Sequence, residues 1–222
     1  MTGPSHPAVI DVLMHRHGRT FAAEAGIRVE RNVPSVLFQL LCLSLLVSAR
    51  IRGEVALEAA RALVAAGWGT PERMAAAAWA ERVRVLDAAG YARYDESTSR
   101  YLGRTADLVV ERCRGDLRRL RAEATGSIAA LQSGLTGFPG IGRVGAAFFL
   151  REVQIAWEEL VPFVDERARA GAVSLGLPSE PHELLAVAGA TPFAVFVAAL
   201  VRTDLARDGD DIIAVAARAS SS

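Results

Sequence analysis

Apolar residues in this 222-residue chain recur every three or four positions along nearly its whole length, and sustained apolar/polar alternation is almost absent. Because that spacing places apolar side chains on one face of an α-helix, the sequence predicts an all-α protein of about ten helices joined by short turns. Strands are hard to place anywhere. Hydrophobic residues make up 51% of the chain, which at this length is enough to bury a sizeable core.

Helix ends are marked locally in several places. Thr70, Pro71 and Glu72 combine a capping hydroxyl, a proline at the first helical position and an acid in the first turn, which predicts a helix start. Ser97 is expected to cap a long helix that ends near residue 114. The expected helices cover residues 7–17, 34–50, 54–66, 71–89 in two pieces, 97–114, 127–133, 143–160, 166–175, 180–188, 192–206 and 210–217.

The side-chain inventory excludes several kinds of chemistry. All 25 basic residues are Arg and there is no Lys, so no ε-amine is present to bind phosphate in a P-loop or to form a Schiff base. Two cysteines, Cys42 and Cys113, are too few for a disulfide framework or a four-thiolate cluster, and we expect a reducing cytoplasm. The most apolar run, residues 36–49, falls short of the roughly 20 residues that span a bilayer, and the N-terminus does not resemble a signal peptide.

The 25 Arg balance 25 acidic residues, but the two charges are unevenly distributed. Residues 1–146 hold 19 Arg and 14 acids, whereas residues 147–222 hold 6 Arg and 11 acids. The densest positive stretch, from Arg100 to Arg121, contains seven Arg and three acids. This stretch is either a phosphate-facing stripe or the solvated face of an amphipathic helix, and the sequence leaves both interpretations open.

Residues 137–142 read Gly-Phe-Pro-Gly-Ile-Gly and lie between two expected helices. Gly140 and Gly142 allow a tight turn and leave backbone N–H groups unblocked at the start of the second helix, where an anion is favoured. Gly145 and Ala146 are small enough for the preceding helix to pack closely. The stretch predicts a backbone-mediated phosphate clamp without sequence specificity. The alternative is an ordinary helix–turn–helix corner with a glycine stop.

A family resemblance rests on this stretch and on the residues downstream of it. Phe138-Pro139-Gly140-Ile141-Gly142-Arg143, an apolar helix and then Pro162-Phe163-Val164-Asp165 resemble, in that order, the helix-hairpin-helix and the downstream catalytic Asp of the endonuclease III superfamily of DNA glycosylases. The segment from Pro34 to Arg50 is similar to the first barrel helix of that family. The resemblance covers about residues 30–205.

The resemblance implies a helix-hairpin-helix DNA glycosylase fold, in which two helical domains flank a DNA-binding cleft. The barrel domain would comprise residues 34–146, and the second domain would join residues 1–33 to residues 147–222. The residues implied to bind DNA phosphate are Gly140, Ile141, Gly142, Arg143 and Gly145.

The resemblance also makes Asp165 the catalytic carboxylate. Cleavage of an N-glycosidic bond builds positive charge on the deoxyribose, which a carboxylate can stabilise while it orients the attacking water. The target base must first leave the stack, and Arg50 with Tyr91 or Tyr94 would fill the gap. Three alternatives stay open: Asp165 as the N-cap of the next helix, Arg50 as a surface residue, and the tyrosines as packing residues.

Three departures from the family pattern refine the expectation. Bifunctional members place a Schiff-base Lys where this chain has Val144, so we expect no β-lyase activity. Many members end in a four-Cys iron–sulfur loop, but no Cys follows Ala206, so we expect no cluster. Asp165-Glu166-Arg167 stands where the family usually has Asp-Thr-His, which leaves the substrate open.

The sequence therefore predicts a monofunctional DNA glycosylase of base excision repair, which flips a damaged or mismatched base and removes it by hydrolysis to leave an abasic site. The alternative is a non-catalytic helix-hairpin-helix protein that recognises distorted or damaged duplex. The expected partner is double-stranded DNA containing a lesion or mismatch, with no membrane. We expect a cytoplasmic, nucleoid-associated monomer that needs no cofactor; a monovalent cation at the hairpin is left open.

Overall fold

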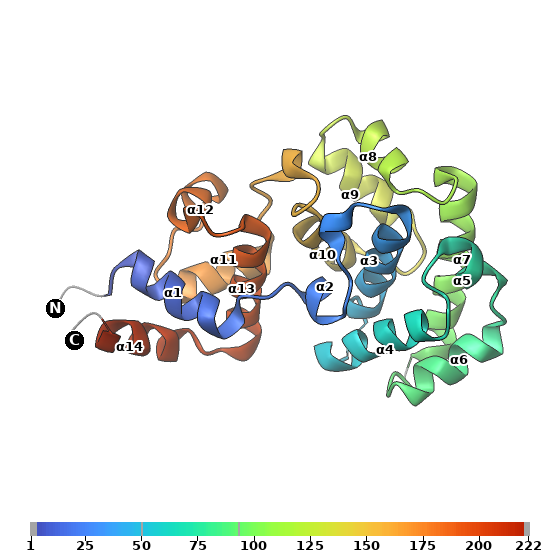
Figure 1. Cartoon of the computed structure of the whole chain (residues 1–222), viewed down its shortest axis with the longest axis horizontal. Helices are drawn as coiled ribbons and strands as arrows, with labels where there is room; N and C mark the ends of the chain where they lie inside the picture. Colours follow the sequence, from blue (N-terminus) through green and yellow to red (C-terminus); the bar gives the residue numbers. More distant parts are fainter. Residues whose placement is uncertain (1–3, 50, 93, 220–222) are drawn as a thin grey trace. The chain divides into compact units, whose positions relative to one another are not determined.

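The computed structural model describes residues 4–49, 51–92 and 94–219. Within those ranges the chain forms fourteen α-helices and two short 3₁₀-helices, with no strand (Figure 1), so the all-α prediction is confirmed. In chain order the elements are α1 (His6–His17), α2 (Phe21–Glu24), η1 (Val29–Arg31), α3 (Pro34–Val47), α4 (Gly53–Ala65), α5 (Pro71–Ala76), α6 (Trp79–Ala88), α7 (Asp95–Cys113), α8 (Arg118–Ala124), α9 (Ile128–Thr136), α10 (Arg143–Val153), η2 (Glu158–Leu160), α11 (Glu166–Ser174), α12 (Pro181–Ala188), α13 (Phe193–Ala206) and α14 (Gly209–Ala219).

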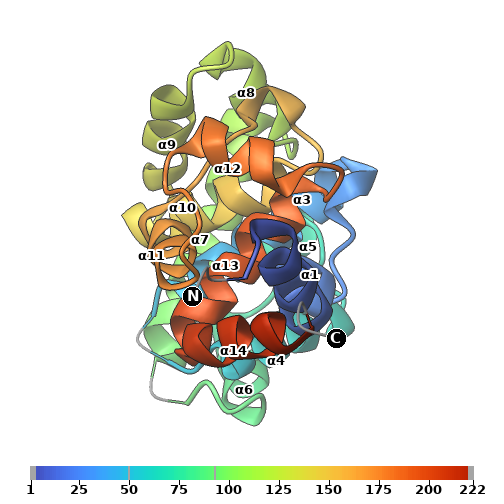
Figure 2. The same ribbon diagram turned by 90° about the vertical axis from the view of Figure 1, so that its left-hand side faces the viewer.

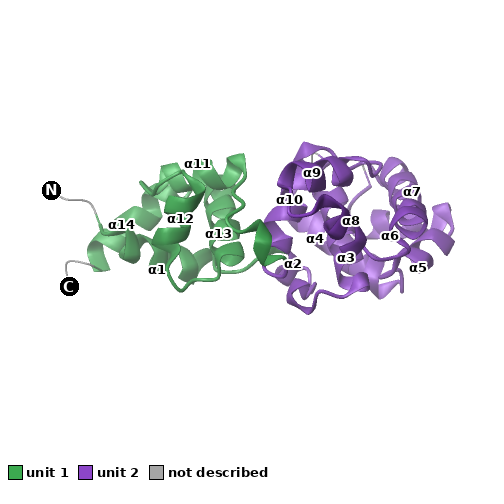
Figure 3. Ribbon diagram, turned by 90° about the horizontal axis from the view of Figure 1, so that it is seen from above, with its two compact units in different colours: residues 1–21, 157–222 green, residues 22–156 purple. Residues whose placement is uncertain are grey.

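The helices fall into two compact units (Figure 3): unit 1 comprises residues 1–21 and 157–222, and unit 2 comprises residues 22–156. The boundaries therefore lie outside the predicted ones, which were at residues 34 and 146. A buried contact accounts for the larger unit 2, because the backbone N–H of Ala22 donates to a carboxylate oxygen of Glu152 at 2.8 Å. This bond ties the first residues of unit 2 to the end of α10.

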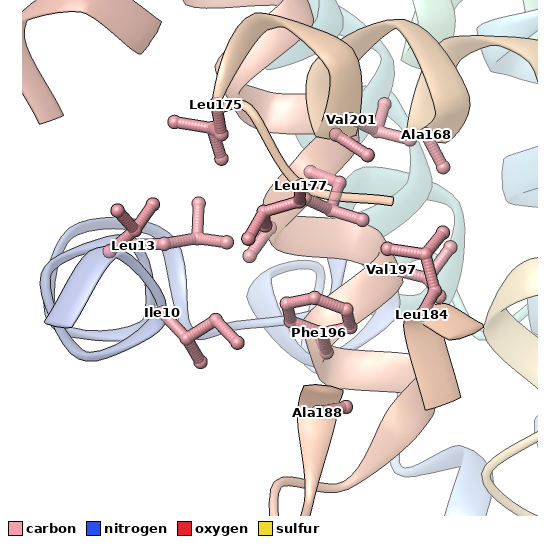
Figure 4. Packing of buried hydrophobic residues seen from close by; sticks show 14 of the residues in the cluster. Ile10, Leu13, Ala168, Leu175, Leu177, Leu184, Ala188, Phe196, Val197 and Val201 are labelled. Carbon is pink, nitrogen blue, oxygen red and sulfur yellow. The ribbon is translucent and has the colours of Figure 1, made fainter. Parts of the chain in front are cut away.

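Unit 1 is built on an apolar core that joins the two ends of the chain. Ile10 and Leu13 of α1 lie in one buried cluster with residues of the C-terminal helices, among them Leu184 and Phe196 (Figure 4). Helices α1 and α14 lie side by side (Figure 2). An ion-pair cluster fastens these two helices, because Asp208 accepts from Arg16 at 3.1 Å and contacts His17 Nε2 at 2.9 Å, while Asp211 lies 2.7 Å from Arg16.

Helix α3 forms the centre of unit 2, where α4, α7 and α10 pack against it. From Val36 to Leu46 every residue of α3 except Gln39 is buried. A helix that is apolar on all sides requires neighbours on all sides, so this stretch organises the rest of the unit.

Local signals predicted most helix starts, with some exceptions. Thr70 caps α5 as expected, since its side chain accepts from the Arg73 N–H at 3.4 Å. The prediction that Ser97 caps the long helix is wrong: α7 begins at Asp95, and the Ser97 hydroxyl donates to the Tyr94 carbonyl at 3.0 Å. The next helix after α7, α8, was not expected as a separate element.

The expected helix over residues 143–160 is too long, because α10 ends at Val153. The apolar pattern continues through Trp157 and Leu160, and both of these side chains are buried. Apolar spacing reports which residues are buried, and here burial continues after the backbone has left the helix.

Among the described residues, no single helix combines the length and the apolar composition needed to cross a membrane. Helices α12 and α13 reach that length and composition only when taken together, and they are bent by 108° at the break between them.

Candidate nucleic-acid interface

A tight hairpin joins α9 to α10 in unit 2, as the sequence predicted. Gly140 has φ +81°, in the left-handed region that favours glycine. The Ile141 N–H donates to the Phe138 carbonyl at 3.1 Å, and both of these side chains are buried. Buried apolar residues on either side of Gly140 therefore hold the turn in place.

Helix α7 supports the hairpin along its length. The Thr105 hydroxyl donates to the Pro139 carbonyl at 3.0 Å, and the Arg112 guanidinium lies 5.6 Å from the centre of the Phe138 ring. A Cβ at Gly140 would lie 3.0 Å from the Tyr101 ring. This role of the three α7 residues was not predicted from the sequence, although their spacings of four and seven residues put all three on one helix face.

The N-terminus of α10 has no side-chain cap. Its N-cap, Gly142, has φ −89° and ψ −171° and carries no side chain to accept a hydrogen bond. Gly142, Arg143 and Val144 are all exposed, and Val144 is 64% exposed. Because the first N–H groups of a helix lack intrahelical acceptors and carry partial positive charge, this terminus can receive an anion.

Gly145 is buried and fixes α10 against α3. A Cβ at this position would collide with the Ser48 hydroxyl and lie 2.8 Å from the Ser44 carbonyl oxygen. The expectation that its small size serves packing against the preceding helix is corrected: the close neighbour is α3. Gly145 thus anchors the first turn of α10, whose first two residues, Arg143 and Val144, remain exposed.

Asp165 lies in unit 1, at the N-cap of α11. Its Oδ1 accepts from the Ala168 N–H at 2.9 Å, and the side chain is half-buried. Asp165 therefore caps α11, which is the alternative role that the sequence left open for this residue. Capping also fixes the direction of the carboxylate, and the helix dipole favours its negative charge.

The three predicted gap-filling residues have different outcomes. Arg50 lies outside the described residues. Tyr91 is 1% exposed, and its hydroxyl donates to the Leu46 carbonyl at 2.9 Å; the proposed wedge role is therefore corrected to packing, because the ring is enclosed by the core of unit 2. Burial raises the pKa of the Tyr91 phenol to about 12. Tyr94, the N-cap of α7, is half-buried.

The residues present do not fit a four-cysteine iron–sulfur cluster. Cys42 and Cys113 are both buried, one inside α3 and the other at the end of α7, and burial raises the pKa of each thiol. In the described part of the chain, no group of three or more His, Cys, Asp or Glu side chains is arranged to hold a metal ion.

The charge asymmetry persists in the two units, although it is slightly smaller than between residues 1–146 and 147–222. Residues 22–156 hold 18 Arg and 14 acidic residues, and the remainder of the chain holds 7 Arg and 11 acidic residues. The open helix N-terminus thus belongs to the basic unit, and Asp165 belongs to the acidic one.

Comparisons with known proteins give one similar fold. No protein-family model matches the sequence, and no curated protein matches it either. Among solved structures, endonuclease III in a trapped covalent intermediate with DNA, described as an estranged-adenine complex, is similar over 73% of this chain and 71% of that chain. The identity is 14% and the TM-score is 0.48. Similarity at this level concerns the fold alone.

Proposed function

We propose that this protein is a monofunctional DNA glycosylase that binds duplex DNA through the α9–α10 hairpin and hydrolyses the bond between a damaged or mismatched base and its sugar. The observation that carries the proposal is the uncapped, exposed N-terminus of α10. Gly140 forms the turn before this terminus and Gly142 is its N-cap. Helix α7 holds the hairpin in place through the hydrogen bond from Thr105 to the Pro139 carbonyl.

The hairpin suits a phosphodiester better than a small anion. It presents backbone N–H groups and lies in a unit with a surplus of Arg, where neighbouring phosphates of one strand gain from the same positive charge. Such contacts would position the protein on DNA without reading its sequence. Recognition of the target base would then depend on flipping it out of the stack.

In the proposed reaction Asp165 stabilises the positive charge that develops on the deoxyribose and orients a water molecule for attack on the anomeric carbon. The N-cap geometry supports this role, because the hydrogen bond from the Ala168 N–H holds the carboxylate in a fixed direction. Hydrolysis needs no cofactor. No Lys side chain is available for a Schiff base, so the product is an abasic site in an intact strand. We further propose that the protein acts as a monomer on DNA in the cytoplasm.

One observation favours a second candidate, a non-catalytic protein that senses distorted duplex. The capping bond already gives Asp165 a structural role, so a carboxylate at this position does not require a catalytic explanation. The two candidates share the hairpin and differ only in what Asp165 does.

The experiment that separates them uses the purified protein and a panel of duplexes, each carrying one lesion or mismatch. Abasic sites are revealed by alkaline strand cleavage. Asp165→Asn is the decisive variant, because Asn is as good an N-cap as Asp and the folded state is retained while the charge is lost. We expect product with the wild type and a loss of about 100-fold or more with Asp165→Asn.

Two controls complete the design. The melting temperature of Asp165→Asn should match that of the wild type, so that a loss of activity can be attributed to the lost charge and not to unfolding. Asp204→Asn changes a half-buried partner of Arg167 in the same unit and should leave turnover unchanged. Tight binding to lesion duplex with no product on the whole panel would establish the sensor instead.

A further inference from the structure

A second feature of unit 2 is a groove of about 690 Å³ between α5 and α6 on one side and α7 on the other. Trp79 and Tyr101 both line it. The chain has 3 Trp, 3 Tyr and 8 Phe, and within the described residues only these two aromatic side chains are exposed, Trp79 by 41% and Tyr101 by 40%. Both exposed aromatic side chains of the described residues thus line one groove.

The groove is also positively charged. Arg100 and Arg104 lie one turn apart on α7, and both are exposed. Arg100 is 4.0 Å from Glu96, whereas Arg104 has no ion-pair or hydrogen-bond partner among the residues that the structure describes. Asp107 adds one negative charge to the lining. Exposed aromatic side chains beside exposed guanidinium groups match the bases and phosphates of an unpaired nucleic-acid strand.

A buried Arg forms the rigid base of the groove. The Arg82 guanidinium donates to the backbone carbonyls of Met74, Ala77 and Ser99 at 2.9, 2.5 and 3.1 Å. It lies against Gly103, where a Cβ would be 2.6 Å from its Nη2. These bonds connect α5, α6 and α7, so the aromatic and cationic side chains project from a fixed frame.

The groove and the hairpin share one residue. The Tyr101 ring that lines the groove is the ring that packs on Gly140 at the tip of the hairpin. A strand whose phosphate is held at the N-terminus of α10 therefore has the groove beside it, within the same unit.

We propose that this groove binds an unpaired segment of DNA next to the duplex held by the hairpin, with bases stacked on Trp79 and Tyr101 and phosphates paired with Arg100 and Arg104. The proposal rests on the proposed function only in taking DNA as the ligand. It adds a substrate preference: DNA whose strands are separated near the contact, as at a gap or a frayed end, binds more tightly than continuous duplex.

The test measures fluorescence anisotropy with a labelled duplex and with the same duplex carrying an unpaired thymine extension at either end. We expect the extension to tighten binding by the wild type about five-fold or more. Trp79→Ala and Arg104→Gln should lose that gain and still bind the plain duplex within two-fold of the wild type. Arg104→Gln should also lower the slope of log affinity against log salt by about 0.7 for the extended DNA.

Two variants control for structural damage. Arg84→Gln removes an exposed Arg from α6 outside the groove and should keep the gain. Trp79→Phe removes the hydrogen bond that the indole donates to the Glu96 carbonyl but keeps an aromatic face, so it should keep the gain as well. Quenching of Trp fluorescence by oligothymidine should be present in the wild type and strongly reduced in Trp79→Phe.

The outcomes are distinguishable. If no DNA of either form binds, the proposed function fails and the groove proposal fails with it. If duplex binds but the extension adds nothing, or if Trp79→Ala and Arg104→Gln behave like Arg84→Gln, the groove proposal alone is overturned. Equal losses in Trp79→Phe and Trp79→Ala would overturn it too, because the contact would then not be stacking.

Discussion

Helices α10 and α11 begin in opposite ways. The N-cap of α10 is Gly142, which has no side chain to accept from the first N–H groups of that helix. The N-cap of α11 is Asp165, whose carboxylate accepts a hydrogen bond from the Ala168 N–H of α11 at 2.9 Å. Both termini carry the same partial positive charge. The N-terminus of α10 is open to an anion from another molecule, whereas the N-terminus of α11 is already occupied by the carboxylate of Asp165. The same partial charge therefore leaves an open terminus at α10 and holds a carboxylate in a fixed direction at α11.

The two helices also resemble each other in how they are anchored. Each carries a buried glycine within its first two turns, Gly145 in α10 and Gly171 in α11, and each glycine lies against the backbone of a neighbouring helix. The placement of each helix terminus depends on that close approach. Substitutions at the two glycines and at the two N-caps therefore test how the termini differ.

The largest effect is expected at Gly171. A Cβ there would be 2.7 Å from the Leu200 carbonyl carbon and nearer still to its oxygen, which belong to the backbone of α13 and cannot rotate away. Gly171→Ala should destabilise unit 1 by about 3 kcal/mol. That loss corresponds to about 6–12 °C in the melting temperature, measured by calorimetry.

Gly145→Ala should cost less, about 1–2 kcal/mol, because the Ser48 hydroxyl can move and only the Ser44 carbonyl is fixed. Gly53→Ala in α4 is the matched control, since its Cβ would meet nothing within 4 Å. A cost at Gly145 equal to that at Gly171 would contradict the argument from backbone rigidity.

Gly142→Asp would make α10 begin as α11 does. The backbone of Gly142 is extended and a Cβ would have open space, so the variant should fold with stability unchanged or raised by a few tenths of a kcal/mol. The new carboxylate would occupy the N–H groups and repel phosphate. We expect duplex affinity, measured by anisotropy, to fall about 100-fold.

Gly142→Ala and Gly142→Asn define the cause of that loss. The first adds a methyl group without a cap and should bind duplex as the wild type does. The second caps without charge and should fall between the other two. Wild-type affinity in Gly142→Asp would mean that phosphate does not bind at this terminus.

At the other terminus, the cap and the charge of Asp165 can be separated by stability alone. Asp165→Ala removes both and should cost about 1 kcal/mol, whereas Asp165→Asn keeps the cap and should cost less than about 0.5 kcal/mol. Urea denaturation measures both values. Equal costs for the two variants would show that the capping bond contributes little to the stability of α11.

The sequence predicted what depends on local chemistry. The Thr70 cap and the turn at Gly140 follow from preferences of single residues and their neighbours. The burial of Tyr91 could not be predicted in this way, because its partner is the Leu46 carbonyl, 45 positions away in the chain. The Thr105 bond to the Pro139 carbonyl spans 34 positions and was missed for the same reason.

The same limit applies to the candidate site. Glycine spacing identified the hairpin, but only the folded chain reveals that Tyr101 joins it to an aromatic groove. The stretch from Arg100 to Arg121 had two interpretations, a phosphate-facing stripe and a solvated helix face, and the structure shows that its Arg residues differ in pairing. Arg118 is held by Asp116 through several hydrogen bonds, whereas Arg104 is exposed beside the groove. Charge counts alone cannot distinguish a paired guanidinium from an available one.

The smallest effect is expected for a substitution at Val144, in the first turn of α10. Val144→Lys places an amine on a side chain that is 64% exposed, so the fold should be unaffected. One added cation should tighten duplex binding a few-fold at low salt and steepen its salt dependence by about 0.9.

The same variant reports whether position 144 reaches the sugar. The wild type contains no Lys, so borohydride reduction with a preformed abasic duplex should trap almost no wild-type protein, and Val144→Lys should give a covalent complex. Arg84→Lys, on α6, controls for nonspecific trapping. Tighter binding without a covalent product would place the phosphates near α10 but the sugar beyond the reach of position 144.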